Sequence, residues 1–124
     1  MRDVLFVAAG GAIGAAMRYL IGTAITARAG EGFPWHTFVI NVVGAFLIGM
    51  LLALPWTGMA SGAPWRLFLV TGILGGFTTF SALSYESIEL VNQGRLVAGL
   101  ANMFGSGVLG MAAAWLGLAA GRLV

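Results

Sequence analysis

Four long apolar segments, separated by short polar connections, dominate the chain. They cover residues 4–27, 33–54, 67–90 and 96–120. Each exceeds the roughly 20 residues that an α-helix needs to cross the hydrocarbon core of a bilayer. The pattern predicts an all-α integral membrane protein with four transmembrane helices. Since nearly every residue belongs to a span or a turn, we expect residues 1–124 to form a single four-helix membrane domain.

The composition agrees with this pattern. Hydrophobic residues make up 60% of the 124 residues and charged residues 8%, with a mean hydropathy of +0.98, which a water-soluble domain of this size hardly tolerates. The absence of cysteine excludes disulfides, thiolate zinc sites and iron–sulfur clusters. The six basic residues are scattered arginines, so no nucleic-acid partner is expected. Trp35, Trp56 and Trp65 fall near the ends of spans, where we expect them to anchor at the headgroup boundary.

The arginines are divided almost evenly between the two sides of the expected bundle. Arg2, Arg66 and Arg122 fall on the side of the N-terminus, and Arg28 and Arg95 fall on the other side. Arginine in short loops biases which side of a membrane protein stays cytoplasmic. So weak an asymmetry is compatible with insertion in both orientations, and oppositely oriented copies would pair about a two-fold axis in the membrane plane.

Glycines recur at four-residue spacing in three of the expected helices. Such pairs allow helix backbones to approach closely in lipid, so we expect tight packing within the chain or between copies. The pairs are Gly10 and Gly14, Gly72 and Gly76, and Gly117 and Gly121.

Arg18 interrupts the first apolar segment about fifteen residues from its start, roughly 20 Å along a helix that rises about 1.5 Å per residue. Ionisable groups at such a depth usually face a protein interior or an aqueous cavity, although a long side chain also reaches the nearer interface by snorkelling. In a water-filled vestibule, a guanidinium that keeps its proton attracts anions and repels cations at any physiological pH.

The third apolar segment contains the run GGFTTFSALS at residues 75–84. Glycine weakens a helix, and Thr78, Thr79 and Ser81 compete for backbone groups, so we expect a break between Gly75 and Ser81. The first half-helix would end in free carbonyls, which suit a cation, and the second would begin with free amides. The alternative is a kinked but continuous helix.

Three further polar residues occur within the spans. Asn41 interrupts the second span, where its amide either joins two helices or donates hydrogen bonds to an anion. Asn102 and Ser106 lie one turn apart in the fourth span, hence on one face, and serve either as interhelical contacts or as part of a polar lining.

His36, Glu86 and Glu89 fall nearer the ends of their spans. His36 has no cysteine, second histidine or nearby carboxylate in the sequence to complete a metal site, so we interpret it as an interfacial polar residue rather than a haem ligand or proton relay. Glu86 and Glu89 lie three residues apart, and we interpret them as an interfacial polar face rather than proton-coupling carboxylates.

The motifs resemble a known family over the full length and all four helices. GGAIGAAMRY at residues 10–19, the run with Asn41 and Gly44, and GILGGFTTFS at residues 72–81 closely resemble the Fluc fluoride ion channels, also called CrcB. The resemblance implies a channel in a prokaryotic cell membrane that exports fluoride passively and relieves fluoride toxicity. It further implies an antiparallel, dual-topology homodimer with two fluoride pathways and a central structural sodium ion that is not transported.

The resemblance also assigns roles to individual residues. The carbonyls of Gly75 and Thr78 would hold the sodium ion, and Arg18 would be the vestibule charge. The expected fluoride pathway comprises Asn41, Thr79, Phe80, Ser81 and Ser106, with Phe80 as the first of two phenylalanines whose ring edges face fluoride.

Two stretches depart from the family pattern. In the third span, Leu83 stands where the family usually has its second phenylalanine, and Ala82 stands where threonine is common. In the fourth span, the family often has a tyrosine followed by serines at four-residue spacing, whereas this chain has Asn102, Ser106 and Gly110. Because some members of the family work as unlike pairs that divide the pore residues, a heterodimer with a paralogue is the alternative to a homodimer.

Two rival functions come from other classes. A small dual-topology multidrug transporter needs a carboxylate in its binding cavity, typically in the first helix, where this chain has Arg18. A non-transporting membrane assembly subunit would leave Arg18, Asn41 and the interrupted third span without a purpose. No enzyme is indicated, because no activated nucleophile, metal cluster or acid–base pair has suitable spacing.

Overall fold

The computed structural model describes residues 1–54 and 63–124, and Trp56 lies outside these residues. The described chain is helical, and four of its stretches are long and apolar enough to cross a membrane, the third being Pro64–Asn92. The all-α prediction with four spans is therefore confirmed. The elements are α1 (Arg2–Ala29), α2 (Trp35–Ala53), α3 (Pro64–Arg66), the π-helix η1 (Leu67–Leu74), α4 (Gly75–Phe77), α5 (Phe80–Asn92) and α6 (Leu96–Gly121).

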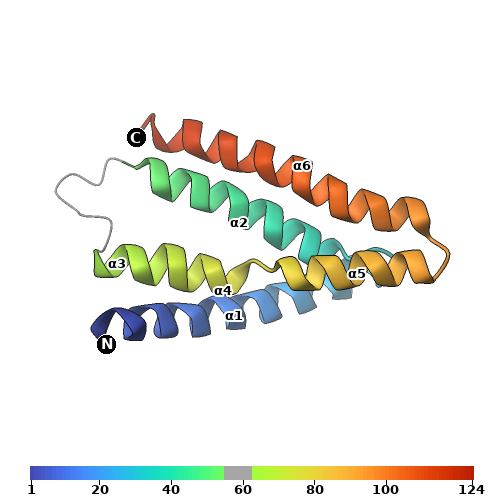
Figure 1. Cartoon of the computed structure of the whole chain (residues 1–124), viewed down its shortest axis with the longest axis horizontal. Helices are drawn as coiled ribbons and strands as arrows, with labels where there is room; N and C mark the ends of the chain where they lie inside the picture. Colours follow the sequence, from blue (N-terminus) through green and yellow to red (C-terminus); the bar gives the residue numbers. More distant parts are fainter. Residues whose placement is uncertain (55–62) are drawn as a thin grey trace.

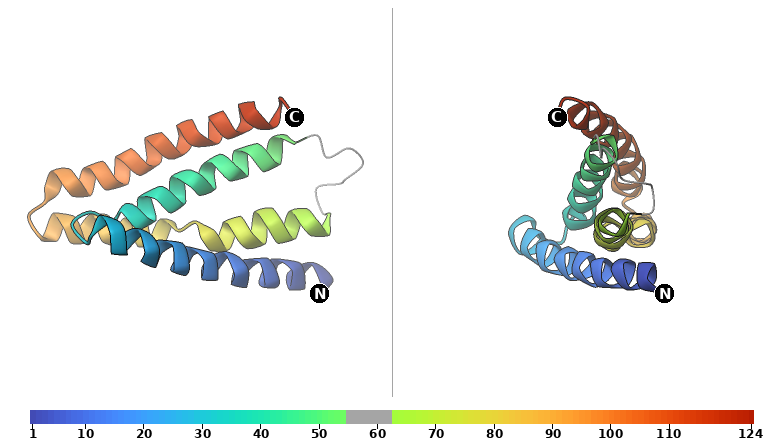
Figure 2. Two further views of the ribbon diagram at one scale, coloured as in Figure 1. Left: turned by 180° about the vertical axis from the view of Figure 1, so that it is seen from behind. Right: turned by 90° about the vertical axis from the view of Figure 1, so that its left-hand side faces the viewer.

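The four spans run up and down, and both termini lie at the same end of the bundle (Figure 1). The main packing pairs are α2 with α6, α1 with η1 and α4, and α5 with α6. Figure 2 shows α1 and α6 on opposite sides, with α2 and the third span between them. Gly30 and Gly94 have positive φ values of 79° and 77° in the two turns at the far end, a conformation that glycine adopts at no steric cost.

Glycines allow the closest contacts between helices. A Cβ added to Gly72 of η1 would lie 2.8 Å from Cα of Gly10 on α1, and one added to Gly14 would collide with the carbonyl oxygen of Ile73. On α6, a Cβ at Gly117 would collide with the carbonyl oxygen of Phe46 on α2. The glycine pairs predicted from the sequence therefore make close packing within one chain.

The third span is interrupted after Phe77. Thr78 (φ −81°, ψ 158°) and Thr79 (φ −153°, ψ 118°) are extended, and α5 begins at Phe80. The break lies between Gly75 and Ser81 as predicted, so the kinked but continuous helix is wrong. The preceding π-helix was not predicted. Its wider turn ends where the amide of Gly75 donates to the carbonyl of Val70, five residues earlier.

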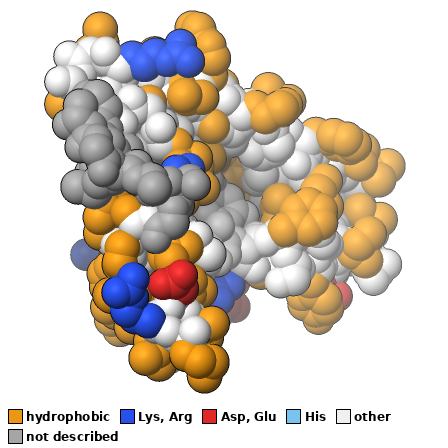
Figure 3. Space-filling view, turned by 60° about the vertical axis from the view of Figure 1, so that its left-hand side comes forward, with side chains coloured by type: hydrophobic (Ala, Val, Ile, Leu, Met, Phe, Trp, Pro, Cys, Tyr) orange, Lys and Arg blue, Asp and Glu red, His pale blue; other side chains and the backbone are white. Residues whose placement is uncertain are grey.

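The apolar core is thin. The buried hydrophobic side chains are Ile40, Leu74, Phe77, Leu83 and Leu90. Many other large apolar side chains are exposed, and Figure 3 shows hydrophobic side chains over the flanks of the bundle. Such flanks suit contact with lipid tails or with another membrane helix.

Candidate functional site

Asn41 fastens the break in the third span to α2. Its Oδ1 accepts a hydrogen bond from the backbone N–H of Thr79 at 2.8 Å, and its Nδ2 donates to the carbonyl oxygen of Thr79 at 3.0 Å. The Asn41 side chain thus pairs both the N–H and the C=O of Thr79, an extended residue whose backbone groups are not paired within a helix. Of the two roles predicted for Asn41, the structure shows the contact that joins two membrane spans. An amide nitrogen carries two hydrogens, and the second N–H of Asn41 has no acceptor among residues 1–54 and 63–124.

Two carbonyl groups at the break lose their helical donors. In a continuous α-helix, the amides of Thr79 and Ala82 would donate to the carbonyls of Gly75 and Thr78, four residues earlier. Here the Thr79 amide donates to Asn41, and the Ala82 amide donates to Oγ1 of Thr79 at 3.3 Å. Among the described residues, no hydrogen bond ends on either carbonyl oxygen. These are the two carbonyls that the family resemblance assigns to a sodium ion.

A cavity of about 620 Å³, here called the break cavity, opens beside these carbonyls. Phe80 lines it with 74% of its surface exposed, whereas Leu83 lines it from the interior and is only 6% exposed. Ser106 contributes a buried Oγ that has no hydrogen-bond partner in the described part of the chain. The break cavity therefore combines two free carbonyls with an unpaired hydroxyl and an exposed aromatic ring. The residues of the predicted site that line it are Asn41, Gly75, Thr78, Thr79, Phe80 and Ser106.

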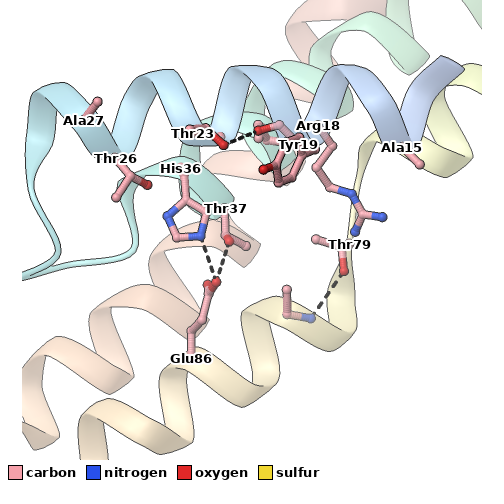
Figure 4. A pocket seen from close by; sticks show the side chains of 13 residues that line it. Ala15, Arg18, Tyr19, Thr23, Thr26, Ala27, His36, Thr37, Thr79 and Glu86 are labelled. Atoms are coloured by element: carbon pink, nitrogen blue, oxygen red, sulfur yellow. Dashed lines mark hydrogen bonds and ion pairs between the residues drawn. The ribbon is translucent and has the colours of Figure 1, made fainter.

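Arg18 lies in a second cavity, of about 660 Å³, here called the arginine cavity. In Figure 4 its side chain extends from α1 toward Thr79. Within residues 1–54 and 63–124, no carboxylate lies within 4.0 Å of the Arg18 guanidinium, so its charge is available to the cavity. Thr79 lines both cavities, which places the break between them.

Ser81 lies outside both cavities. It is exposed, and its hydroxyl forms a 3.2 Å hydrogen bond with Oγ1 of Thr79. Ser81 therefore contacts the candidate path through Thr79.

The structure brings His36 and Glu86 together, a pairing that the sequence did not predict. Nε2 of His36 lies 3.0 Å from Oε1 of Glu86, and Oγ1 of Thr37 donates to the same oxygen at 2.8 Å. All three line the arginine cavity, where His36 and Thr37 point toward Glu86 (Figure 4). His36 does have a nearby carboxylate, which sequence spacing hid because the two residues are 50 positions apart. Glu89 is exposed and accepts from Gln93 at 3.2 Å, as expected for a surface residue.

Asn102 joins α6 to α5. It is fully buried, and its Nδ2 donates to Oγ of Ser87 at 3.0 Å. Ser87 in turn donates to the carbonyl oxygen of Leu83 at 2.7 Å. The Ser87 hydroxyl donates its single hydrogen to the Leu83 carbonyl, so its oxygen must accept from Asn102. This fixes the orientation of the Asn102 amide. The interhelical alternative therefore holds for Asn102.

Four membrane-spanning stretches, with two cavities that share Thr79 at the break in the third stretch, define a multi-pass membrane protein. The model of the CrcB-like protein family, Camphor Resistance (CrcB), matches residues 5–118, and the chain belongs to this family. The protein is not an enzyme, because the relatives it matches are named as ion channels.

The relatives match the chain over nearly its whole length. A protein of Rhizobium meliloti is 46% identical over 119 residues, which cover 96% of this chain and 95% of the relative. A protein of Thermus thermophilus is 48% identical, covering 94% of this chain and 93% of the relative, and an Agrobacterium fabrum protein is 45% identical, covering 98% of each. Each of the three is named "Fluoride-specific ion channel FluC".

Proposed function

We propose that this protein is a fluoride-selective ion channel through which fluoride leaves the cell passively, relieving fluoride toxicity. Its family and the names of its relatives support fluoride as the ion. The observation that carries the proposal is the meeting of the arginine cavity and the break cavity at Thr79. Such an arrangement suits an anion that enters beside a fixed positive charge and continues past hydrogen-bond donors.

The path runs from Arg18, past Thr79, to the break cavity. Arg18 raises the local concentration of anions by its charge. Fluoride is strongly hydrated, so it enters a narrow path only where donors replace its water. The second N–H of Asn41 and the unpaired hydroxyl of Ser106 supply such donors, with the Thr79 and Ser81 hydroxyls beside them. The ring edge of Phe80 adds the positive part of an aromatic quadrupole.

The Gly75 and Thr78 carbonyls fit a structural sodium ion, because hard cations prefer oxygen ligands and neither oxygen accepts a hydrogen bond from the described residues. A site that collects the same two carbonyls from each of two copies would tie the copies together at their breaks. Bound there, sodium would supply a fixed positive charge that holds the two subunits together and is not itself transported.

The proposed assembly is an antiparallel homodimer in the cell membrane. Exposed apolar side chains surround the break cavity, among them Phe80 (74%), Phe104 (66%) and Met111 (71%). A second copy would cover these side chains together with the carbonyls. The nearly even division of the arginines, three on one side and two on the other, supports opposite orientations of the copies.

A small multidrug exporter is the second candidate, and one observation favours it. Glu86 places a carboxylate in the arginine cavity, as a proton-coupled cation carrier requires. Arg18 lines the same cavity and opposes an organic cation, so the anion channel is preferred. Uptake of a quaternary ammonium dye by proteoliposomes under a proton gradient would favour the exporter.

The test uses purified dimer in liposomes loaded with potassium fluoride. A potassium ionophore is added, and a fluoride electrode records release. We expect rapid release that requires the ionophore, because passive anion flow stops unless a cation compensates the charge. Liposomes loaded with potassium chloride should release far less anion. A folded dimer that releases no fluoride, alone or with a paralogue, would contradict the proposal.

A further inference from the structure

The pair of His36 and Glu86 lies at the boundary between two cavities. Both residues line the arginine cavity, and both also line a smaller cavity of about 280 Å³ near the turn between α1 and α2. Glu31 and Glu89 line the smaller cavity and do not line the arginine cavity. The charge of this pair therefore acts directly on the arginine cavity.

The hydrogen bonds allow His36 to change its charge without releasing Glu86. An ionised Glu86 can only accept a hydrogen bond, so with Glu86 in that form the 3.0 Å bond to His36 places a proton on Nε2. In that neutral tautomer, Nδ1 is free to take a second proton, which makes the ring cationic while Nε2 still donates. Thr37 holds the same carboxylate oxygen throughout. The side chain of His36 is 36% exposed, so its ring is accessible from the two cavities that it lines.

The charges around His36 determine how its protonation changes the net charge of the arginine cavity. From α1, Arg18 and Tyr19 face the arginine cavity, and from α5, Glu86 faces it. On the smaller cavity, the titratable groups are Tyr85, Glu86 and Glu89 of α5 and Glu31 of the turn. With His36 neutral, the positive charge of Arg18 and the negative charge of Glu86 offset each other in the arginine cavity. With His36 protonated, the cavity is net positive.

We infer that His36 is a charge-setting residue for anion entry, and that its protonation increases fluoride flux. This inference rests on the proposed function. Histidine is the side chain whose ordinary charge change falls between about pH 5 and pH 8. A single charge in a cavity with low-dielectric walls changes the local concentration of anions severalfold or more. Fluoride flux should therefore be higher when the His36 ring is protonated than when it is neutral.

The experiment compares the wild type with His36→Gln in the liposome assay. Glutamine retains an N–H that can donate to Glu86 but never becomes charged. We expect wild-type flux at about pH 5.5 to exceed that at about pH 7.5 by on the order of three- to tenfold. Leakage of protein-free liposomes is subtracted at each pH. His36→Gln should give a flat profile, and high salt should shrink the wild-type response, because screening weakens a charge effect.

Other outcomes separate this inference from the proposed function. If both proteins release fluoride with the same pH profile, His36 is not the charge-setting group and the inference fails alone. A wild-type profile that is flat, or that is unchanged by high salt, also contradicts it. If the folded wild-type dimer releases no fluoride at any pH, the proposed function fails and the inference fails with it.

Discussion

Asn41 on α2 holds both backbone groups of Thr79 in the third span, through hydrogen bonds of 2.8 Å and 3.0 Å. The two residues are 38 positions apart, and the contact lets an extended residue lie inside a membrane bundle. A backbone interrupted at this depth is tolerated only where protein or water pairs its polar groups. The contact also turns the Thr79 amide away from Gly75, so Asn41 helps to create the free carbonyl that the proposed cation site requires.

Asn41→Ala should destabilise the fold by about 2–4 kcal/mol, because it leaves a backbone donor and an acceptor of Thr79 unpaired. The measurement is the unfolding temperature of the purified protein in detergent. Val43→Ala is the matched control, since Val43 is on the same helix and 44% exposed. Equal unfolding temperatures for the two variants would show that Asn41 does not hold the break.

Gly117→Ala should destabilise the packing of α6 on α2 by about 1–3 kcal/mol. A Cβ at Gly117 would collide with the carbonyl oxygen of Phe46, whereas one at Gly110, two turns earlier on α6, meets nothing within 4 Å. Gly110→Ala should leave stability unchanged or raise it by up to about 1 kcal/mol, because alanine is the better helix former. Thermal unfolding of both variants in one detergent checks the pair. A lower unfolding temperature for Gly110→Ala than for Gly117→Ala would contradict the packing.

The sequence predicts the length of the spans, the break in the third span and the glycine contacts, because each of these features depends on residues close together in the chain. Span length follows from the thickness of the bilayer, and the break at Thr78 and Thr79 follows from glycine and hydroxyl residues close together in the chain. The glycine pairs follow from four-residue spacing on a helix. Each of these signals lies within one segment, so no knowledge of its neighbours is needed.

The pairing of distant residues could not be predicted in the same way. His36 and Glu86 meet because the start of α2 lies beside the middle of α5, which only the packing of the two helices determines. Leu83 and Phe80 are three residues apart, yet one is buried and the other exposed. Their difference in exposure depends on which face α5 turns toward α6. Because the extended residues Thr78 and Thr79 separate α5 from the preceding helix, that face cannot be extrapolated from the first half of the span.

Arg18→Gln should lower fluoride throughput on the order of tenfold at low ionic strength, because it removes the fixed positive charge of the arginine cavity. The deficit should shrink at high salt, where screening already weakens the field. Initial rates of fluoride release at two salt concentrations check this. Arg28→Gln is the control, since Arg28 is on the same helix, is exposed and does not line the cavity. Size-exclusion chromatography should show intact dimers for both, and equal rates would rule out the vestibule role of Arg18.

Replacing sodium with a large organic cation should weaken the dimer if the carbonyls of Gly75 and Thr78 hold sodium. A large cation cannot approach carbonyl oxygens as closely as sodium does, so it would not bridge the carbonyl oxygens of the two copies. Chemical crosslinking at increasing detergent dilution measures the dimer fraction in sodium and in N-methylglucamine. A dimer fraction that is independent of the cation would contradict the site.

Phe80→Ala and Leu83→Ala should give opposite signatures. Leu83 is 6% exposed, so its truncation leaves a hole in the core and should cost about 2–4 kcal/mol of stability. Phe80 is 74% exposed within one chain, so its truncation should cost far less stability while removing the aromatic edge from the fluoride path. We therefore expect Phe80→Ala to reduce fluoride release more than Leu83→Ala does, and Leu83→Ala to lower the unfolding temperature more. If both variants lose flux equally while dimers persist, the ring of Phe80 has no special part in permeation, and the path must be lined by the hydroxyls and the amide alone.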